Sequence, residues 1–156
     1  MSEVAAAPTF EQQLARVAGY VGSLPRGPRA ELRRLRQHAD EIPPDIFWQV
    51  VDKHDLAPSE EDWWLAILPL MVAHEHQPGR RPGHALKQAG VKPARLERWL
   101  RYDRDRAIEE AHRLLALLDS GFDWVRMGKL LRWWTDHQRR ELARDFFLGQ
   151  AEGDEA

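Results

Sequence analysis

Apolar residues recur at helical spacing through most of the chain. Near the start, Leu14, Val17, Ala18 and Val21 are spaced so that their side chains share one face of a helix. No stretch alternates apolar and polar residues as a half-buried strand does, and no Asn-Gly or Asp-Gly hairpin turn occurs. The pattern predicts an all-α fold, a helical bundle of about seven or eight helices.

Capping residues, prolines and glycines predict where the helices begin and end. Thr9 with Gln12 has the spacing of a capping box, and Ser59 with Asp62 repeats it before a strongly apolar stretch. Pro69 lies inside this stretch and is expected to kink or split the helix. The other predicted helices cover residues 28–38, 45–53, 84–89 and 93–102, a helix capped by Asp105, residues 124–134 capped by Asp123, and a last helix from Thr135 to Gly149.

The clearest loop in the chain is residues 77–83, which read Gln-Pro-Gly-Arg-Arg-Pro-Gly. It separates an N-terminal helical part, residues 9–76, from a C-terminal helical part, residues 84–149. The helices therefore form either a single bundle or two small lobes. We expect residues 1–8 to be disordered and the acidic tail, residues 150–156, to be frayed.

The absence of cysteine excludes disulfides and thiolate metal sites, and it favours a cytoplasmic protein. The N-terminus has neither the basic segment nor the apolar segment of a signal peptide. The longest apolar stretch, residues 63–73, is too short to span a bilayer.

Histidines near the middle of the chain are the first candidates for a metal site. His74, Glu75 and His76 precede His84. Two His residues two positions apart on a helix point about 200° away from each other, so they do not converge on one ion. The sequence therefore predicts no metal site, and these histidines are interpreted as residues near a helix end.

Paired carboxylates are the candidates for catalysis. Asp103 with Asp105, and Glu109 with Glu110, lie near the start of a predicted helix, where acids favour the helix dipole. The chain has no Gly-x-Ser-x-Gly motif, no cysteine nucleophile and no glycine-rich phosphate loop. We predict that the protein is not an enzyme and uses no cofactor.

Charge is distributed unevenly along the chain, although the net charge is only −2. Residues 40–62 hold eight acids against one Lys, whereas residues 80–140 hold fifteen Lys and Arg against eight acids. Residues 26–36 add five Arg against one Glu. This asymmetry predicts one acidic face and one basic face.

Three predicted helices carry a basic stripe opposite their apolar side. Arginine suits phosphate because its planar guanidinium donates to two oxygens at once. A basic stripe is also typical of the ordinary solvated face of an amphipathic helix, and the sequence alone leaves both interpretations open. The stripes are Arg29, Arg33 and Arg36; Arg95, Arg98 and Arg101; and Arg126, Lys129 and Arg132.

A series of motifs in the C-terminal half resembles one known family. In order, they are Gly83-His84-Ala85-Leu86, Arg98-Trp99-Leu100-Arg101-Tyr102-Asp103-Arg104, Arg113-Leu114-Leu115, Phe122-Asp123-Trp124, Met127, Leu130-Leu131, Trp133-Trp134, and Arg139 with Leu142 and Asp145-Phe146. The series is similar to that of the CasB family, the small subunit of the type I-E CRISPR surveillance complex, Cascade. Residues 30–34 (Ala-Glu-Leu-Arg-Arg) and Phe47-Trp48 resemble its N-terminal half more loosely.

The resemblance implies a two-lobed helical bundle without catalytic activity, present as a homodimeric pair in the complex. It implies contacts with the backbone subunits and the large subunit, and basic surfaces that hold crRNA and target DNA in the R-loop. Motif positions carry this role to Arg98, Arg101, Arg104, Arg113 and Arg139, and more loosely to Arg33 and Arg34. Facial clustering alone adds Arg95, Arg126, Lys129 and Arg132 as candidate nucleic-acid-binding residues.

Several alternatives stay open at this point. The chain could be a purely structural adaptor that bridges other subunits, with the acidic residues 40–62 as a docking face. Arg104 and Arg113 could form ion pairs with Asp103 or Asp145 instead of binding phosphate. We expect Trp124, Trp133 and Trp134 to build the core rather than stack on bases. Because the chain is net acidic, its affinity for nucleic acid is expected to depend on assembly.

Overall fold

The computed structural model describes residues 7–35 and 42–149 of the 156-residue chain. These described residues contain no strand; His76 and Phe122 form an isolated bridge. The all-α prediction is confirmed, with nine α-helices and one 3₁₀ helix in the described part. They are α1 Phe10–Ser23, α2 Arg26–Arg33, α3 Asp45–His54, the 3₁₀ helix η2 Pro58–Glu60, α4 Glu61–Ala73, α5 Pro82–Gln88, α6 Pro93–Leu100, α7 Arg104–Leu115, α8 Trp124–Trp133 and α9 Asp136–Phe147.

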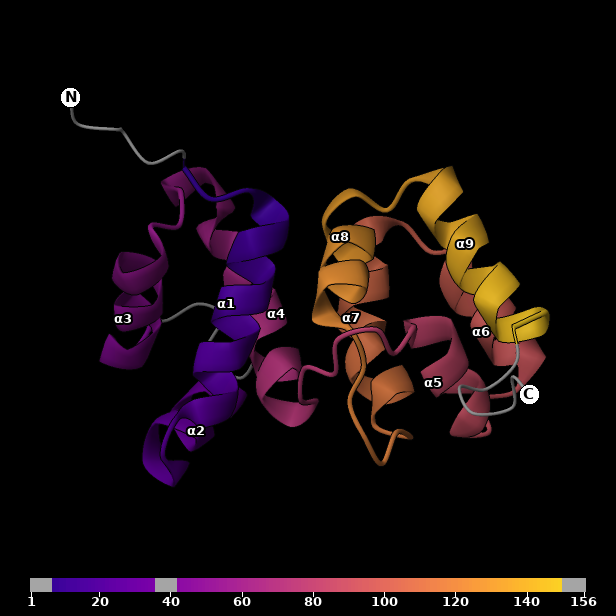
Figure 1. Ribbon diagram of the computed structural model, residues 1–156, viewed down its shortest axis with the longest axis horizontal. Coiled ribbons are helices and arrows are strands. Elements are labelled where there is room, and N and C mark those ends of the chain that lie inside the picture. The colour runs from indigo at the N-terminus through magenta and orange to yellow at the C-terminus, as the bar shows by residue number, and fades with distance from the viewer. Residues whose placement is uncertain (1–6, 36–41, 150–156) are drawn as a thin grey trace.

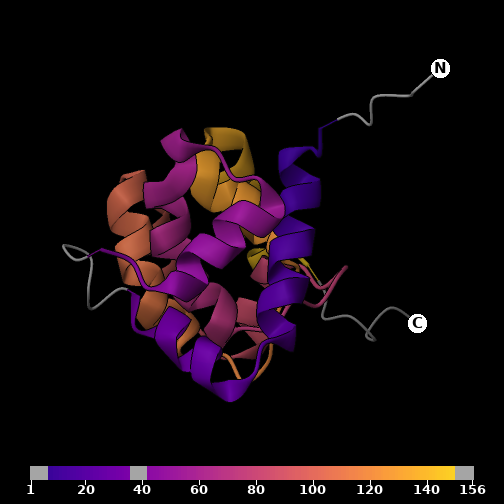
Figure 2. The same cartoon turned by 90° about the vertical axis from the view of Figure 1, so that its left-hand side faces the viewer.

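The helices lie in two groups that stand side by side (Figure 1). Helices α1 to α4 make one group and α5 to α9 the other, with α7 and α8 packed against α1 and α4. Figure 2 looks onto the side of the molecule formed by α1 to α4. One hydrophobic core runs through both groups. The division into two lobes at residues 77–83 stays a prediction.

Aromatic side chains join the two groups where α1, α4 and α8 meet. The ring of Phe10 lies 5.4 Å from that of Trp63 and 5.1 Å from that of Trp133, measured between centroids. The indole Nε1 of Trp63 donates to the backbone oxygen of Leu131 at 3.2 Å. Since aromatic rings bury large areas and prefer such tilted contacts, this cluster fixes α8 against the N-terminal helices.

Three predicted caps are confirmed. Thr9 accepts from the backbone N–H of Gln12, whose side chain accepts from the Thr9 N–H, so the capping box of α1 is complete. Asp123 caps α8, and Thr135 caps α9. Each side-chain oxygen satisfies a backbone N–H that has no partner within its helix.

The sequence misplaced two caps. Asp103, not Asp105, caps α7, accepting from the N–H of Arg106 at 2.9 Å. Ser59 caps nothing, because it lies inside the 3₁₀ helix that precedes α4, and α4 has no side-chain cap. These errors have one cause: neighbouring polar residues offer alternative starts, and packing decides between them.

Several predicted helix boundaries also need correction. Helix α5 begins at Pro82, inside the predicted loop 77–83, rather than at His84. Helix α4 is continuous through Pro69, so the helix is not split there, and the alternative, a kink at Pro69, stays a prediction. Helix α2 begins at Arg26 rather than at Pro28 and ends at Arg33. Some predictions fall on residues outside the described part of the chain. These are the extension of the second helix to residue 38 with its stripe residue Arg36, the acids at positions 40 and 41, and the expected disorder of residues 1–6 and fraying of residues 150–156. Among the described helices, none is both long and apolar enough to cross a membrane.

Candidate nucleic-acid interface

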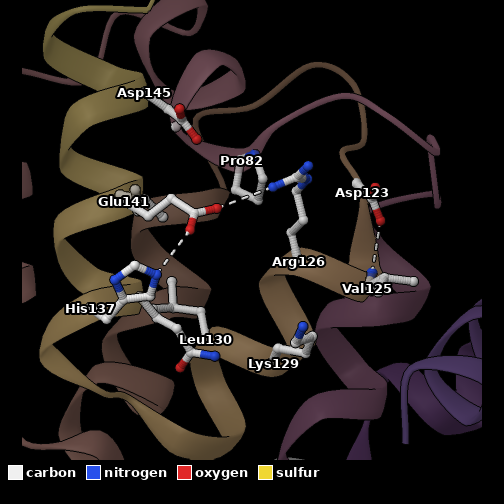
Figure 3. A pocket seen from close by; sticks show the side chains of 12 residues that line it. Pro82, Asp123, Val125, Arg126, Lys129, Leu130, His137, Glu141 and Asp145 are labelled. Atoms are coloured by element: carbon white, nitrogen blue, oxygen red, sulfur yellow. Dashed lines mark hydrogen bonds and ion pairs between the residues drawn. The ribbon is translucent and has the colours of Figure 1, made fainter. Parts of the chain in front are cut away.

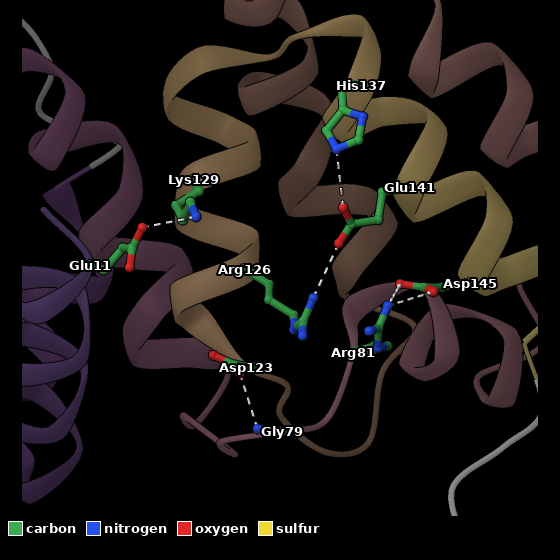
Figure 4. A network of polar contacts seen from close by, with 9 residues as sticks. All are labelled: Glu11, Gly79, Arg81, Asp123, Arg126, Lys129, His137, Glu141 and Asp145. Carbon is green, nitrogen blue, oxygen red and sulfur yellow. Dashed lines mark hydrogen bonds and ion pairs between the residues drawn. The ribbon is translucent and has the colours of Figure 1, made fainter.

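The basic stripe of α8 is engaged in ion pairs within the molecule. Each of its three cationic side chains reaches an acid on a different element, and Figure 4 shows two of these pairs. Salt bridges of this kind leave little positive charge for an external anion. The pairs are Arg126 with Glu141 of α9 at 3.1 Å, Lys129 with Glu11 of α1 at 2.9 Å, and Arg132 with Glu60 of η2 at 3.6 Å.

The hollow between α8 and α9 has balanced charge. It encloses about 420 Å³ and is lined by Arg126 and Lys129 together with the carboxylates of Asp123, Glu141 and Asp145 (Figure 3). Asp145 in turn accepts two hydrogen bonds from the guanidinium of Arg81 on the loop before α5, at 2.9 and 3.1 Å. This hollow therefore does not supply the excess of positive charge that a phosphate backbone requires.

Arg104 and Arg139 bind backbone oxygens at the ends of helices. Arg104 donates to the oxygen of Arg132 at 3.1 Å, and Arg139 donates to the oxygen of Leu100 at 3.0 Å. Such carbonyls lack partners within their own helices, so the two arginines stabilise helix C-termini. Both side chains are also close to an acid: Arg104 pairs with Asp105 and Arg139 with Asp136.

The hollow between α6 and α7 has a different composition. It encloses about 250 Å³ and brings together Arg95 and Arg98 of α6 with Arg113 of α7. Arg95 and Arg98 are exposed and form no ion pair with any acid in the described part of the chain. Arg113 lies 3.7 Å from Glu110, the one acid that lines the hollow. The arrangement leaves an excess of positive charge facing solvent.

Buried hydrogen bonds hold this corner of the molecule in place. The indole Nε1 of Trp99 on α6 donates to the oxygen of Ala107 on α7 at 2.9 Å. The indole Nε1 of Trp134, after α8, donates to the oxygen of Tyr102 at 2.8 Å. Because both donors belong to buried tryptophans, the α6–α7 connection is fixed at two points, and the arginines project from a rigid base.

The other arginines predicted to bind nucleic acid, Arg101, Arg33 and Arg34, do not line the α6–α7 hollow. Arg101, which follows α6, is exposed and extends the basic surface of that helix. Arg33 and Arg34 are exposed at the end of α2, which packs against α3 and α4 in the other group of helices. The structure thus brings Arg95, Arg98 and Arg113 together and leaves the N-terminal arginines on a separate surface.

Sequence reasoning missed an arginine–tyrosine pair at the edge of the hollow. The guanidinium carbon of Arg106 lies 4.1 Å from the centroid of the Tyr102 ring. Tyr102 lines the hollow, and Arg106 belongs to the first turns of α7. Helical spacing gave no signal for this pair, because Tyr102 precedes the cap of α7 and only Arg106 lies in the helix.

The predicted core role holds for two of the three tryptophans. Trp124 is fully buried and Trp134 is 7% exposed, but Trp133 is 48% exposed, so the prediction is wrong there. Helical spacing explains the difference. The buried residues Trp124, Met127, Leu131 and Trp134 follow intervals of three and four, and Trp133 falls off that stripe.

Two of the candidate histidines, His74 and His76, have structural partners. Burial lowers the pKa of His74, whose ring stacks on Phe122 at 5.8 Å. His76 accepts from the backbone N–H of Trp124 through Nδ1 at 3.0 Å. Within residues 7–35 and 42–149, no group of three or more His, Asp or Glu is placed to hold a metal ion.

Comparisons with known proteins identify relatives of this chain. The model of the family CRISPR-associated protein Cse2 matches residues 28–147. The CRISPR system Cascade subunit CasB of Escherichia coli (strain K12) is 32% identical over 75 residues, which cover 47% of this chain and 47% of that protein. The matching stretch therefore spans about half the length of this curated relative.

Solved structures agree on the fold. A chain from the crystal structure of E. coli Cascade bound to a PAM-containing double-stranded DNA target superposes with a TM-score of 0.69, at 23% identity, covering 87% of this chain and 95% of that one. CasB from Thermus thermophilus gives 0.68 at 20% identity, covering 90% and 99%. These likenesses establish a shared fold. Together with the family model, which spans most of the chain, they confirm the resemblance inferred from the sequence: the chain belongs to the CRISPR-associated Cse2 family.

Proposed function

We propose that the chain is a non-catalytic subunit of a type I-E Cascade complex in the cytoplasm, where it binds nucleic acid without sequence preference and stabilises the R-loop of guide RNA and target DNA. The α6–α7 hollow is the observation that carries the proposal. Three arginines meet there against one acid, and two of them have no acidic partner among the described residues.

The chemistry of the hollow suits phosphate. A guanidinium donates two parallel hydrogen bonds to phosphate oxygens, and each neutralised phosphate releases counterions. An R-loop replaces a DNA duplex by an RNA–DNA duplex of similar stability, so a few added backbone contacts shift the balance. Binding to the backbone requires no particular base, which agrees with a subunit that serves any guide sequence.

Assembly would supply the affinity that the free chain lacks. The net charge is −2, and the three cations of α8 already have acidic partners, so the free chain offers phosphate less positive charge than its basic stripes suggest. Other Cascade subunits, crRNA, target DNA and a second copy of the chain would present several basic surfaces together, which multiplies their individual affinities.

A structural adaptor is the second candidate function. Its support is the N-terminal group, where Trp48 is 41% exposed and Ile42 is 88% exposed next to the acids of α3. Exposed apolar side chains near carboxylates are typical of a protein-docking face rather than a nucleic-acid surface. Both functions could reside in one subunit, on opposite groups of helices.

Charge reversal in the assembled complex tests the proposal. The variant Arg95→Glu/Arg98→Glu should shorten R-loop lifetime while the complex still assembles. The matched control, Arg140→Glu/Arg144→Glu, makes the same change of charge on exposed arginines of α9 and should have a smaller effect. If the first variant assembles and its R-loop lifetime equals that of the wild type, the α6–α7 hollow is not the contact. If it no longer assembles, the adaptor function is favoured.

A further inference from the structure

We infer that Tyr102 and Arg106 form a stacking platform for an unpaired nucleobase, adjacent to the arginines that would hold the phosphate. The inference rests on the proposed function and makes it more specific. It assigns to the α6–α7 hollow a single-stranded or extruded nucleotide as its ligand, rather than an intact duplex.

The pair is already stacked in the structure. Arg106 lies over the Tyr102 ring at 4.1 Å, well inside the range of a cation–π contact. The Arg106 side chain is exposed and forms no ion pair with an acid in the described part of the chain. A guanidinium that lies over a ring and remains exposed to solvent offers a planar, cationic group for a base to contact.

The platform and the hollow are continuous. Arg106, Glu110 and Arg113 follow one another on α7 at intervals of four and three, so they share one face of that helix. Glu110 and Arg113 line the hollow, as does the Tyr102 side chain. A phosphate between the arginines of α6 and α7 would therefore have its neighbouring base beside the Tyr102–Arg106 pair.

The backbone around the pair is anchored, so the platform is formed before any ligand arrives. The indole Nε1 of Trp134 donates to the backbone oxygen of Tyr102, and the Asp103 carboxylate accepts from the backbone N–H of Arg106. A pre-formed aromatic and guanidinium surface avoids the entropy cost of ordering two side chains on binding.

Stacking selects for unpaired bases without selecting a sequence. Every base has a π-face that packs on an aromatic ring or a guanidinium plane, but in a duplex these faces are covered by neighbouring base pairs. The platform thus accounts for two properties at once: tolerance of any base, and preference for a strand that has left its duplex.

The test compares two oligonucleotides of equal charge. Fluorescence anisotropy at low salt would measure binding of the full chain to a labelled 20-nucleotide oligo-dT and to an abasic 20-mer with the same phosphates. We expect the oligo-dT to bind at least about fivefold more tightly, the lower end of what one base–aromatic stack contributes. An oligo-U of the same length extends the comparison to RNA.

Matched variants separate stacking from charge. Tyr102→Leu should lower the affinity for oligo-dT to that of the abasic 20-mer and leave the abasic affinity within about twofold, whereas Tyr102→Phe should keep the preference. Arg106→Lys keeps the charge but loses the planar group, so it should also reduce the preference. Arg95→Gln/Arg98→Gln should weaken both oligonucleotides by the same factor, because both carry the same phosphates.

The outcomes distinguish this inference from the proposed function. Equal binding of oligo-dT and the abasic 20-mer by the wild type overturns the stacking platform and leaves phosphate binding intact. Equal losses in Tyr102→Leu for both oligonucleotides also overturn it, since they would indicate a structural role for the ring. Failure of the wild type to bind either oligonucleotide at low salt overturns the platform as a binding site of this chain, whereas the proposed function is decided by the R-loop lifetime of the assembled Arg95→Glu/Arg98→Glu complex.

Discussion

Gly128 lies where α8 crosses α1, and the absence of a side chain there lets Leu14 fill the crossing. A Cβ added at Gly128 would stand 2.4 Å from Cδ2 and 2.8 Å from Cδ1 of Leu14. Leu14 is fully buried, so it cannot swing away into solvent. We therefore expect Gly128→Ala to force α1 and α8 apart or to push Leu14 into an unfavourable rotamer.

The magnitude follows from two opposing terms. Overpacking a buried site costs about 1–3 kcal/mol. Replacing glycine by alanine inside a helix returns about 1 kcal/mol, because alanine has the higher helix propensity. The expected net change is a destabilisation of up to about 2 kcal/mol, or a fall in melting temperature of up to roughly 8 °C for a chain of this size.

A second glycine provides the control. Gly19 lies inside α1, is exposed, and has no atom within 4 Å of an added Cβ. Gly19→Ala should therefore stabilise the protein by up to about 1 kcal/mol. Thermal and urea unfolding followed by tryptophan fluorescence would measure both variants. If Gly128→Ala is as stable as Gly19→Ala, the two helices do not meet as closely as the structure has them.

Three further predictions concern caps, the α6–α7 corner and pH. Asp103→Ala removes the cap of α7 and should lower the free energy of unfolding by about 1 kcal/mol in urea titrations, whereas Asp105→Ala, which removes no cap, should change it little. Trp134→Phe leaves the oxygen of Tyr102 without its indole donor and should cost about 1–3 kcal/mol, measured in the same way; an unchanged stability would show that the hydrogen bond is dispensable. Burial lowers the pKa of His74, so the unfolded chain binds a proton more readily, and stability should be lost as pH falls below about 6.5. His74→Gln should reduce the difference between urea midpoints at pH 7.5 and pH 5.5, and an unchanged difference would assign the pH dependence to other groups, such as His54, whose pKa burial also lowers.

Local signals predicted the helices well and their exact starts less well. The capping box at Thr9 involves residues three apart, so the sequence contains all the information needed to place it. Asp103 precedes α7 and Asp105 lies in its first turn, and on the sequence alone either could cap a helix that starts there. Contacts from outside α7 fix where the helix starts: Trp134 donates to the oxygen of Tyr102 just before the cap, and Trp99 donates to the oxygen of Ala107 in the first turn.

The candidate site, too, depends on contacts between residues that are distant in the sequence. Sequence periodicity correctly placed the cations of α8 opposite its buried stripe, and did so equally well for α6. What periodicity cannot indicate is which acids the fold will bring to each stripe. Glu11 and Glu60 lie far from α8 in the chain, yet they pair with Lys129 and Arg132.

Whether a basic helix face can bind an anion depends on how many of its cations lack an acidic partner in the folded protein, and not on how many cations the sequence places on that face. The two stripes are similar by count: α8 contributes three cations, and α6 contributes two, with Arg101 directly after it. In α8 each of the three faces a carboxylate of another element, so an incoming phosphate would have to displace an existing partner. In α6 the neighbouring helix α7 contributes Glu110 as the one acid at the hollow, but also Arg113, and Arg106 just beyond its edge. The tertiary neighbours therefore neutralise one stripe and reinforce the other, which is why the α6–α7 hollow is the stronger candidate for contact with nucleic acid.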